Sequence, residues 1–299
     1  MIRPRLILGL SALLAAAVAF VAPPAARAQA GMPLNQLLQS THIHGLAVDR
    51  ADSGRLLVAT HHGLHALRLD TATVEPVSER RDDFMGFTPH PADASILFAS
   101  GHPAAGGNLG VIKSSDGGRS WSKIADGVGG PVDFHQLDVS RSAPNVLYGG
   151  YNGLQRSDDA GRTWRTVGPL PPDTFDLAVS PTDSEVVYAA TRTGLLRGDS
   201  GGTRWAAEFA AGQTATLVHA SNGALYAFVV GVGLARRTTT DPEWKILTPQ
   251  VHGGYVLHLA VGTGIDPKMF AATHDPKTGL QSISVSVDGG VRWSSLSAR

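Results

Sequence analysis

A short apolar segment recurs six times along the chain, at intervals of about forty residues. Before each copy lies a second strand-like segment, and turn-forming residues such as Asp52-Ser53-Gly54 separate the two, which is the pattern of a β-hairpin. A Gly–apolar pair, as in Gly63-Leu64, opens a third strand after most copies. The six copies are residues 56–59, 96–99, 146–149, 186–189, 224–227 and 269–272. This periodicity predicts six small antiparallel sheets in one repetitive all-β domain.

An eight-residue turn motif follows three of the third strands. It reads Ser-x-Asp-x-Gly-x-x-Trp at residues 114–121, 157–164 and 286–293, and a weaker copy at 200–205 has Ser200 in place of the aspartate. A fifth repeat keeps only Trp244, and the first repeat has none of the motif. We expect the carboxylate to accept backbone N–H groups, the glycine to adopt a positive φ, and the tryptophan to pack between neighbouring sheets.

This turn motif resembles the Asp-box, or BNR repeat, of the propellers found in sialidases, sortilin-type receptors and some glucanases. The resemblance implies a six-bladed β-propeller with four-stranded antiparallel blades, in which the Asp-boxes connect the third and fourth strands. Radial closure of such blades leaves no long exposed sheet edge. The resemblance concerns the fold and carries little information about chemistry.

The N-terminus has the pattern of a secretory signal peptide. Arg3 and Arg5 precede an apolar run over residues 6–22, and Ala26-Arg27-Ala28 fits a signal-peptidase site. We therefore expect residues 1–28 to be removed, residues 29–299 to form a single propeller domain in the periplasm or outside the cell, and the mature protein not to be membrane-bound. Acidic and basic residues balance, which argues against a nucleic-acid partner, and the chain has no cysteine for disulfides or thiolate metal sites.

Histidines concentrate at one predicted end of the propeller. The strand order places the starts of the first strands and the loops between second and third strands together, at an end that we call the upper rim, and the Asp-box residues Asp116, Asp159 and Asp288 at the opposite end. Eight of the twelve histidines fall on the upper rim: His42, His44, His61, His62, His102, His135, His252 and His274.

We expect five of these histidines to converge on a metal ion, with Met85 as a soft ligand and two aspartates in the same shell or the next. Imidazole and thioether donors without cysteine favour copper, whereas imidazole with carboxylate also suits zinc. The predicted ligands are His42, His44, His61, His102, His135 and Met85, with Asp83 and Asp133 beside them.

A narrower resemblance covers the same rim. The segments 42–46, 59–64, 83–87, 100–103 and 133–135 are similar to the motif series of an exported bacterial BNR-repeat family that is usually labelled glycosylhydrolase-like. That likeness keeps a glycoside hydrolase open as an alternative, acting on a small glycan with Asp83 and Asp133 as the paired carboxyl groups, or with Asp173 and Asp176 as the next pair. Whether the protein is an enzyme stays open at this point.

Other propellers act as sialidases or as protein-binding scaffolds. Sialidase chemistry needs an arginine trio and a tyrosine nucleophile, but the predicted rim offers only Arg192, with Tyr151 and Tyr255, which argues against it. A protein-binding scaffold is the remaining alternative. Because the rim is rich in histidine instead of exposed apolar or arginine residues, the sequence favours a metal site over a scaffold.

Overall fold

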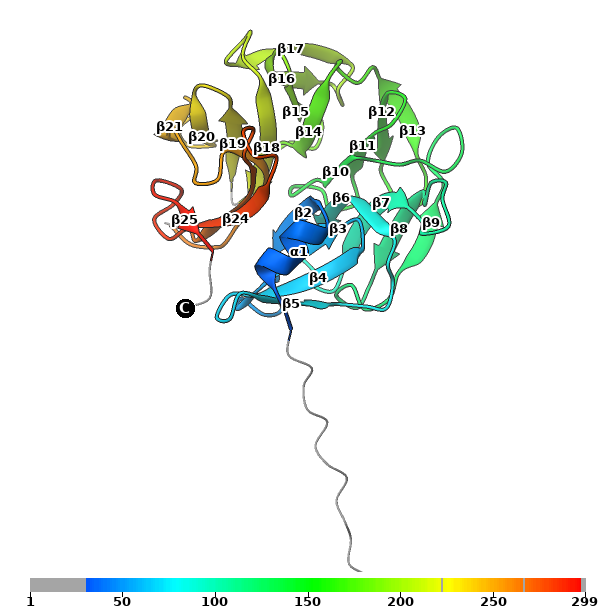
Figure 1. The fold of residues 1–299 in the computed structure, drawn as a ribbon. Helices are drawn as coiled ribbons and strands as arrows, with labels where there is room; N and C mark the ends of the chain where they lie inside the picture. Colours follow the sequence, from blue (N-terminus) through cyan, green and yellow to red (C-terminus); the bar gives the residue numbers. More distant parts are fainter. Residues whose placement is uncertain (1–30, 222, 266, 297–299) are drawn as a thin grey trace, which may run out of the picture. The chain divides into compact units, whose positions relative to one another are not determined.

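The computed structural model describes residues 31–221, 223–265 and 267–296, so the predicted signal peptide lies outside the described residues. Gly31–Arg299 form one compact unit. The described residues contain six antiparallel sheets and a single helix, which confirms the predicted all-β six-bladed propeller (Figure 1). Among the described residues, no helix has the length and apolar character needed to cross a membrane.

Each sheet, or blade, is built from consecutive strands, and the first strand is the innermost and the last the outermost. Blade one comprises β2 (Ile43–Val48), β3 (Arg55–Thr60), β4 (Gly63–Arg68) and β5 (Thr73–Pro76), with the short β1 (Met32–Pro33) added at its outer edge. Blade two comprises β6 (Asp83–Pro89), β7 (Leu97–His102), β8 (Val111–Ser114) and β9 (Ser122–Ala125). Blade three comprises β10 (Gln136–Val139), β11 (Leu147–Gly150), β12 (Leu154–Ser157) and β13 (Arg165–Gly168).

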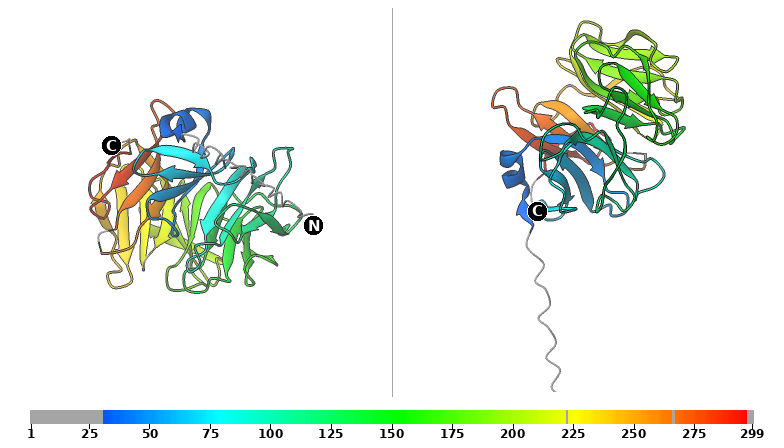
Figure 2. Two further views of the ribbon diagram at one scale, coloured as in Figure 1. Left: turned by 90° about the horizontal axis from the view of Figure 1, so that it is seen from below. Right: turned by 90° about the vertical axis from the view of Figure 1, so that its right-hand side faces the viewer.

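The remaining three blades repeat this order. Blade four comprises β14 (Thr174–Val179), β15 (Val187–Thr191), β16 (Gly194–Asp199) and β17 (Arg204–Phe209). Blade five comprises β18 (Ala215–Ser221), β19 (Ala224–Val229), β20 (Gly233–Thr238) and β21 (Lys245–Thr248). Blade six comprises β22 (Tyr255–Val261), β23 (Met269–His274), β24 (Gln281–Ser286) and β25 (Ser294–Ser295). The inner strands contact one another in sequence, and β22 contacts β2, so the ring closes (Figure 2).

The recurring apolar segments are buried on both faces because each blade lies between two others. In β3, Leu56 and Val58 belong to the core shared with blade six, which includes Phe270. Their neighbours Leu57 and Ala59 point to the other face, into the core shared with blade two. Alternation of side chains along a strand thus places successive apolar residues in different cores, which explains why these segments are continuously apolar.

Three of the predicted turns have the same hydrogen bonds. In the turn at residues 114–121, the Ser114 Oγ accepts the Gly118 N–H at 2.8 Å, the Asp116 Oδ1 accepts the Ser120 N–H at 2.9 Å, and the Trp121 indole donates to the Gly118 carbonyl at 2.9 Å. Gly118 has φ +91°, and a Cβ there would lie 2.5 Å from the Leu64 Cδ2, so glycine is required. The turns at 157–164 and 286–293 repeat these contacts.

The strand order places these turns at the end opposite the upper rim, as the sequence predicts for Asp116, Asp159 and Asp288. Each of them connects the third strand to the fourth, whereas His44 and His135 lie at the start of a first strand. The weaker copy differs, because its Trp205 indole donates to Pro169 of the preceding blade instead of to its own turn.

An N-terminal segment that the repeat pattern does not predict covers the junction between blades one and six. β1 pairs with β5 through Met32 and Val74, and helix α1 (Leu34–Ser40) follows directly. Leu37 is buried in a core with Phe270 and Ile283 of blade six. A seven-residue helix is not stable by itself, so this packing holds it in place.

We expect Leu37→Ala to destabilise the protein by about 2–4 kcal/mol, because it removes a side chain from the core between the first and last blades. The measurement is the free energy of unfolding from urea titration, with Gln39→Ala on the exposed side of the same helix as the control. Equal, small effects of both variants would show that the segment does not contribute to ring closure.

Candidate functional site

The upper rim holds two groups of histidine and aspartate side chains, contributed by blades one to three. We call them the Asp83 triad, which comprises His44, His61 and Asp83, and the Asp133 triad, which comprises His102, Asp133 and His135. Within each triad, one donor atom from each residue lies within 4.8 Å of the others, so each triad is able to hold a metal ion. Six of the eight residues predicted for the site thus separate into two sets of three instead of converging on one point.

In the Asp83 triad, His61 bridges the other two side chains. Its Nδ1 lies 2.8 Å from the Asp83 Oδ2, and its Nε2 lies 3.1 Å from the His44 Nε2. His44 is the extra residue of a β-bulge in β2, since Ile43 pairs with Thr60 and Gly45 pairs with Ala59. A bulge redirects a side chain locally, which accounts for how His44 meets a residue of the next blade.

In the Asp133 triad, both imidazoles meet one carboxylate oxygen. The Nε2 atoms of His102 and His135 lie 3.0 and 2.7 Å from the Asp133 Oδ2. The His102 Nδ1 donates to the Gly107 carbonyl at 2.8 Å, since a carbonyl only accepts. In the neutral ring, this bond leaves the Nε2 lone pair facing the carboxylate. A shared cation, or a second proton on the ring, relieves that repulsion.

Each carboxylate also has an oxygen without a partner. Among the described residues, the Asp83 Oδ1 and the Asp133 Oδ1 are buried and accept no hydrogen bond. The Asp133 side chain is only 8% exposed. A buried carboxylate oxygen without a donor is costly, and a bound cation is one way to satisfy it.

The two triads affect the pKa values of their histidines in opposite directions. Burial and the neighbouring His61 lower the pKa of His44 to about 4, although Asp83 opposes this shift. The hydrogen bond that His135 donates to Asp133 raises the pKa of His135, and the charge of Asp83 contributes to the same shift. Because Asp83 and His135 belong to different triads, this interaction also indicates that the triads are neighbours.

The sheet pairing connects the triads directly. Asp83 is the first residue of β6 and is paired in register with His102, the last residue of β7. Directly opposed residues of antiparallel strands have Cα atoms about 4.5–5.5 Å apart. The carboxylate of one triad and an imidazole of the other therefore project from adjacent backbone positions.

The other predicted residues lie outside the triads. The exposed His42 has its ring 5.6 Å from the ring of His61, at the edge of the Asp83 triad. Met85 is 7% exposed and lies two residues beyond Asp83 in β6, so the alternation of side chains places it on the same face of the sheet. Three further rim histidines also lie outside both triads: His62, His252 and His274.

The alternative carboxylate pair is divided by the fold. Asp173 is exposed and forms an ion pair with Arg192 at 3.0 Å. Asp176 instead lines the central channel, where it accepts the Val218 N–H at 3.1 Å and where burial raises its pKa well above the ordinary value. The two aspartates therefore differ in environment, one at the surface and the other in the channel.

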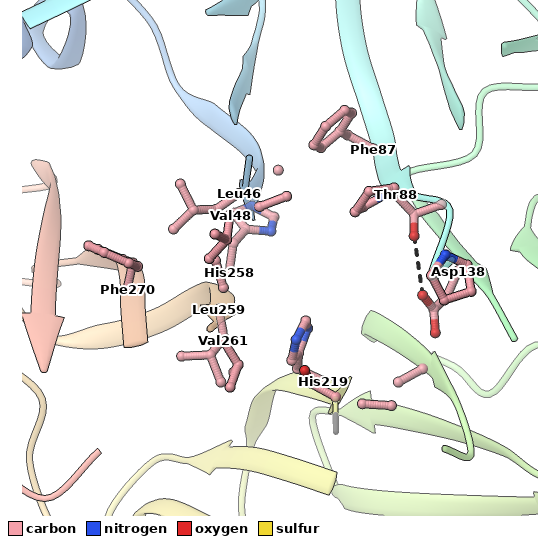
Figure 3. Close-up of a pocket in the computed structure, with 18 of the residues that line it drawn as sticks. Leu46, Val48, Phe87, Thr88, Asp138, His219, His258, Leu259, Val261 and Phe270 are labelled. Carbon is pink, nitrogen blue, oxygen red and sulfur yellow. Dashed lines mark hydrogen bonds between the residues drawn. The ribbon is translucent and has the colours of Figure 1, made fainter. Parts of the chain in front are cut away.

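A cavity of about 580 Å³ occupies the part of the central channel away from the triads. Aliphatic side chains such as Leu46 and Val261 surround two histidines, His219 and His258 (Figure 3). Burial lowers the pKa of His219 to about 3 and that of His258 to about 4, so both rings are neutral in the folded protein. The sequence places these histidines within strands but does not indicate that they share a cavity.

Comparison with known proteins defines the fold more than the chemistry. No family model and no curated protein matches the chain. Among solved structures, the GH74 xyloglucanase from Xanthomonas campestris has 20% identity and a TM-score of 0.55, covering 89% of this chain and 46% of that one. The GH74 enzyme from Niastella koreensis has 15% identity and a TM-score of 0.59, with 90% and 46% covered.

A third neighbour is an extracellular domain from B. thetaiotaomicron, which is described as part of a hybrid two-component system. It has 13% identity and a TM-score of 0.52, covering 90% of this chain and 33% of that one. The chain therefore spans less than half the length of these three structures. At these identities the likeness establishes a propeller similar to those of glycoside hydrolases, and no shared activity.

Because the fold keeps the two cavity histidines neutral, we expect the free energy of unfolding to decrease at acidic pH. Their unfolded pKa is near 6.5, so the unfolded chain binds protons that the folded protein excludes, and stability declines as the pH falls from about 6.5 toward 4. We expect a loss of at most about 2 kcal/mol per histidine at pH 5. This loss is measured as the difference between the urea midpoints of unfolding at pH 7.5 and at pH 5. His219→Asn should reduce this difference, whereas His252→Asn on the surface should leave it unchanged. An unchanged difference in His219→Asn would contradict the assignment.

Proposed function

We propose that this protein binds a divalent transition-metal ion at its upper rim. The observation that carries the proposal is the pair of buried, unpartnered oxygens, Asp83 Oδ1 and Asp133 Oδ1, each on a carboxylate that already contacts histidine nitrogens. Two imidazoles and one carboxylate form a common donor set for zinc and for first-row transition metals.

The spacing of the donors supports the proposal. Ligands that share an ion at 2.0–2.1 Å in tetrahedral geometry lie about 3.4 Å from one another. In the Asp83 triad, the His44 Nε2 lies 3.1 Å from the His61 Nε2 and 3.9 Å from the Asp83 Oδ1. Small side-chain movements therefore suffice to bind an ion.

Hydrogen bonding of the second nitrogen of a histidine ring also supports the proposed metal site. Histidine ligands commonly donate their other ring N–H to a carbonyl or carboxylate, which fixes the tautomer and the ring orientation. His102 has such a bond to Gly107, so its Nε2 is the free donor.

We favour copper as the ion, with zinc as the alternative. Copper(II) binds nitrogen and oxygen donors more tightly than the other divalent first-row metals do. The buried thioether of Met85, on the same sheet face as Asp83, adds a soft donor near the site. We further propose that the protein is exported, on the basis of the signal-peptide pattern at residues 1–28 and of its similarity to an extracellular domain.

A glycoside hydrolase is the second candidate, and the similarity to GH74 propellers favours it. Asp83 and Asp133 would supply the two carboxyl groups. Both carboxylates contact histidine nitrogens, and the Asp133 carboxylate raises the pKa of His135. Hydrolysis of xyloglucan that is lost in Asp83→Asn would favour this function over metal binding.

Copper(II) and zinc(II) titration of the wild type and of His44→Ala/His135→Ala tests the metal site. We expect the double variant to bind at least about 100-fold more weakly, because it removes one imidazole from each triad. The matched control is His252→Ala/His274→Ala, which removes two rim histidines of blade six and should bind as the wild type does. Equal, weak metal uptake by all three proteins would show that these histidines do not form a metal site.

A further inference from the structure

We infer that the upper rim is a two-ion centre, in which the Asp83 triad and the Asp133 triad each bind one divalent transition-metal ion. The inference rests on the proposed function and adds the number of ions, their ligands and the difference between their sites.

The donors divide into two complete sets. Each triad has two imidazoles and one carboxylate, the two triads share no residue, and each aspartate lies within ion-pair distance of both histidines of its own triad. Each aspartate also has its own buried oxygen that lacks a partner among the described residues. One ion in each triad would satisfy both oxygens, because each triad supplies three donors of its own.

The two sites are close enough to interact. Asp83 and His102 are opposed in register across β6 and β7, so ligands of different ions originate from backbone positions about 5 Å apart. A hydrogen bond from backbone to side chain supports the same junction, since the Asp82 carboxylate accepts the Ala104 N–H at 3.1 Å just beyond His102. The two ions would therefore lie within about 10 Å of each other.

The sites differ in access to solvent. In the Asp83 triad, the side chains of His44, His61 and Asp83 are 18%, 39% and 19% exposed. In the Asp133 triad, the two imidazoles are 42% and 53% exposed around a buried carboxylate. An ion in the Asp133 triad would exchange with solvent more readily, and three protein donors leave each ion a coordination position for water or another ligand.

The test is the number of copper(II) ions retained after loading and removal of excess metal, measured by mass spectrometry of the metal per folded chain. We expect two ions in the wild type, one in His44→Ala/His61→Ala and one in His102→Ala/His135→Ala. The control His252→Ala/His274→Ala should retain two. A weak chelator should remove the first ion from the wild type at the same rate as the ion retained by His44→Ala/His61→Ala, which keeps the exposed triad.

Electron paramagnetic resonance provides a second readout that does not depend on stoichiometry alone. Two copper(II) ions within about 10 Å broaden each other's spectrum, so the wild type should show dipolar broadening that both double variants lose. One ion in the wild type, with none in either double variant, would overturn the two-ion centre and indicate a single site built from both triads. No retained ion in the wild type would instead reject the proposed function itself.

Discussion

The packing of six inner strands around one channel determines where every polar group of the site lies. These strands are connected across blades by hydrogen bonds from side chains to the neighbouring backbone. Asp138 of β10 accepts the Val179 N–H of β14 at 2.8 Å, and the Thr216 hydroxyl of β18 donates to the Val256 carbonyl of β22 at 2.7 Å. Because the ring is fixed in this way, residues distant in sequence meet at its upper rim without belonging to one sheet.

Much of the fold follows from local sequence. Six strand pairs and the serine–aspartate–glycine turns predict the blades, because hairpin pairing and turn geometry depend on neighbouring residues. Blade five forms with little of the turn motif, since Trp244 still stacks on Phe209, with 4.9 Å between ring centroids. The segment of β1 and α1 has no repeat partner, so its position depends on the core between blades one and six and is not readable from periodicity.

The candidate site was predicted only in part. The sequence places the histidines on one rim and puts Asp83 and Asp133 beside them, but it does not separate them into two triads. That separation depends on the bulge that redirects His44 and on the loop that orients His102 through the Gly107 carbonyl. Backbone irregularities of this kind follow from tertiary packing, so spacing along the chain does not reveal them.

The channel has two polar regions of different character. At the upper rim, imidazoles face carboxylates, and the pKa values of His44 and His135 are shifted in opposite directions. Farther along, His219 and His258 lie among aliphatic side chains, and burial is the main cause that keeps them neutral. Only the first region combines nitrogen donors with buried, unpartnered carboxylate oxygens, which is why we assign the metal there and not to the larger cavity.

Anomalous diffraction at the copper edge, from crystals grown with copper(II), tests this account most directly. The account predicts strong peaks at the upper rim, one among His44, His61 and Asp83 and one among His102, Asp133 and His135, each about 2.0–2.1 Å from imidazole nitrogens. Peaks confined to His252, His274 or the cavity histidines, or no peak within the upper rim, would contradict it.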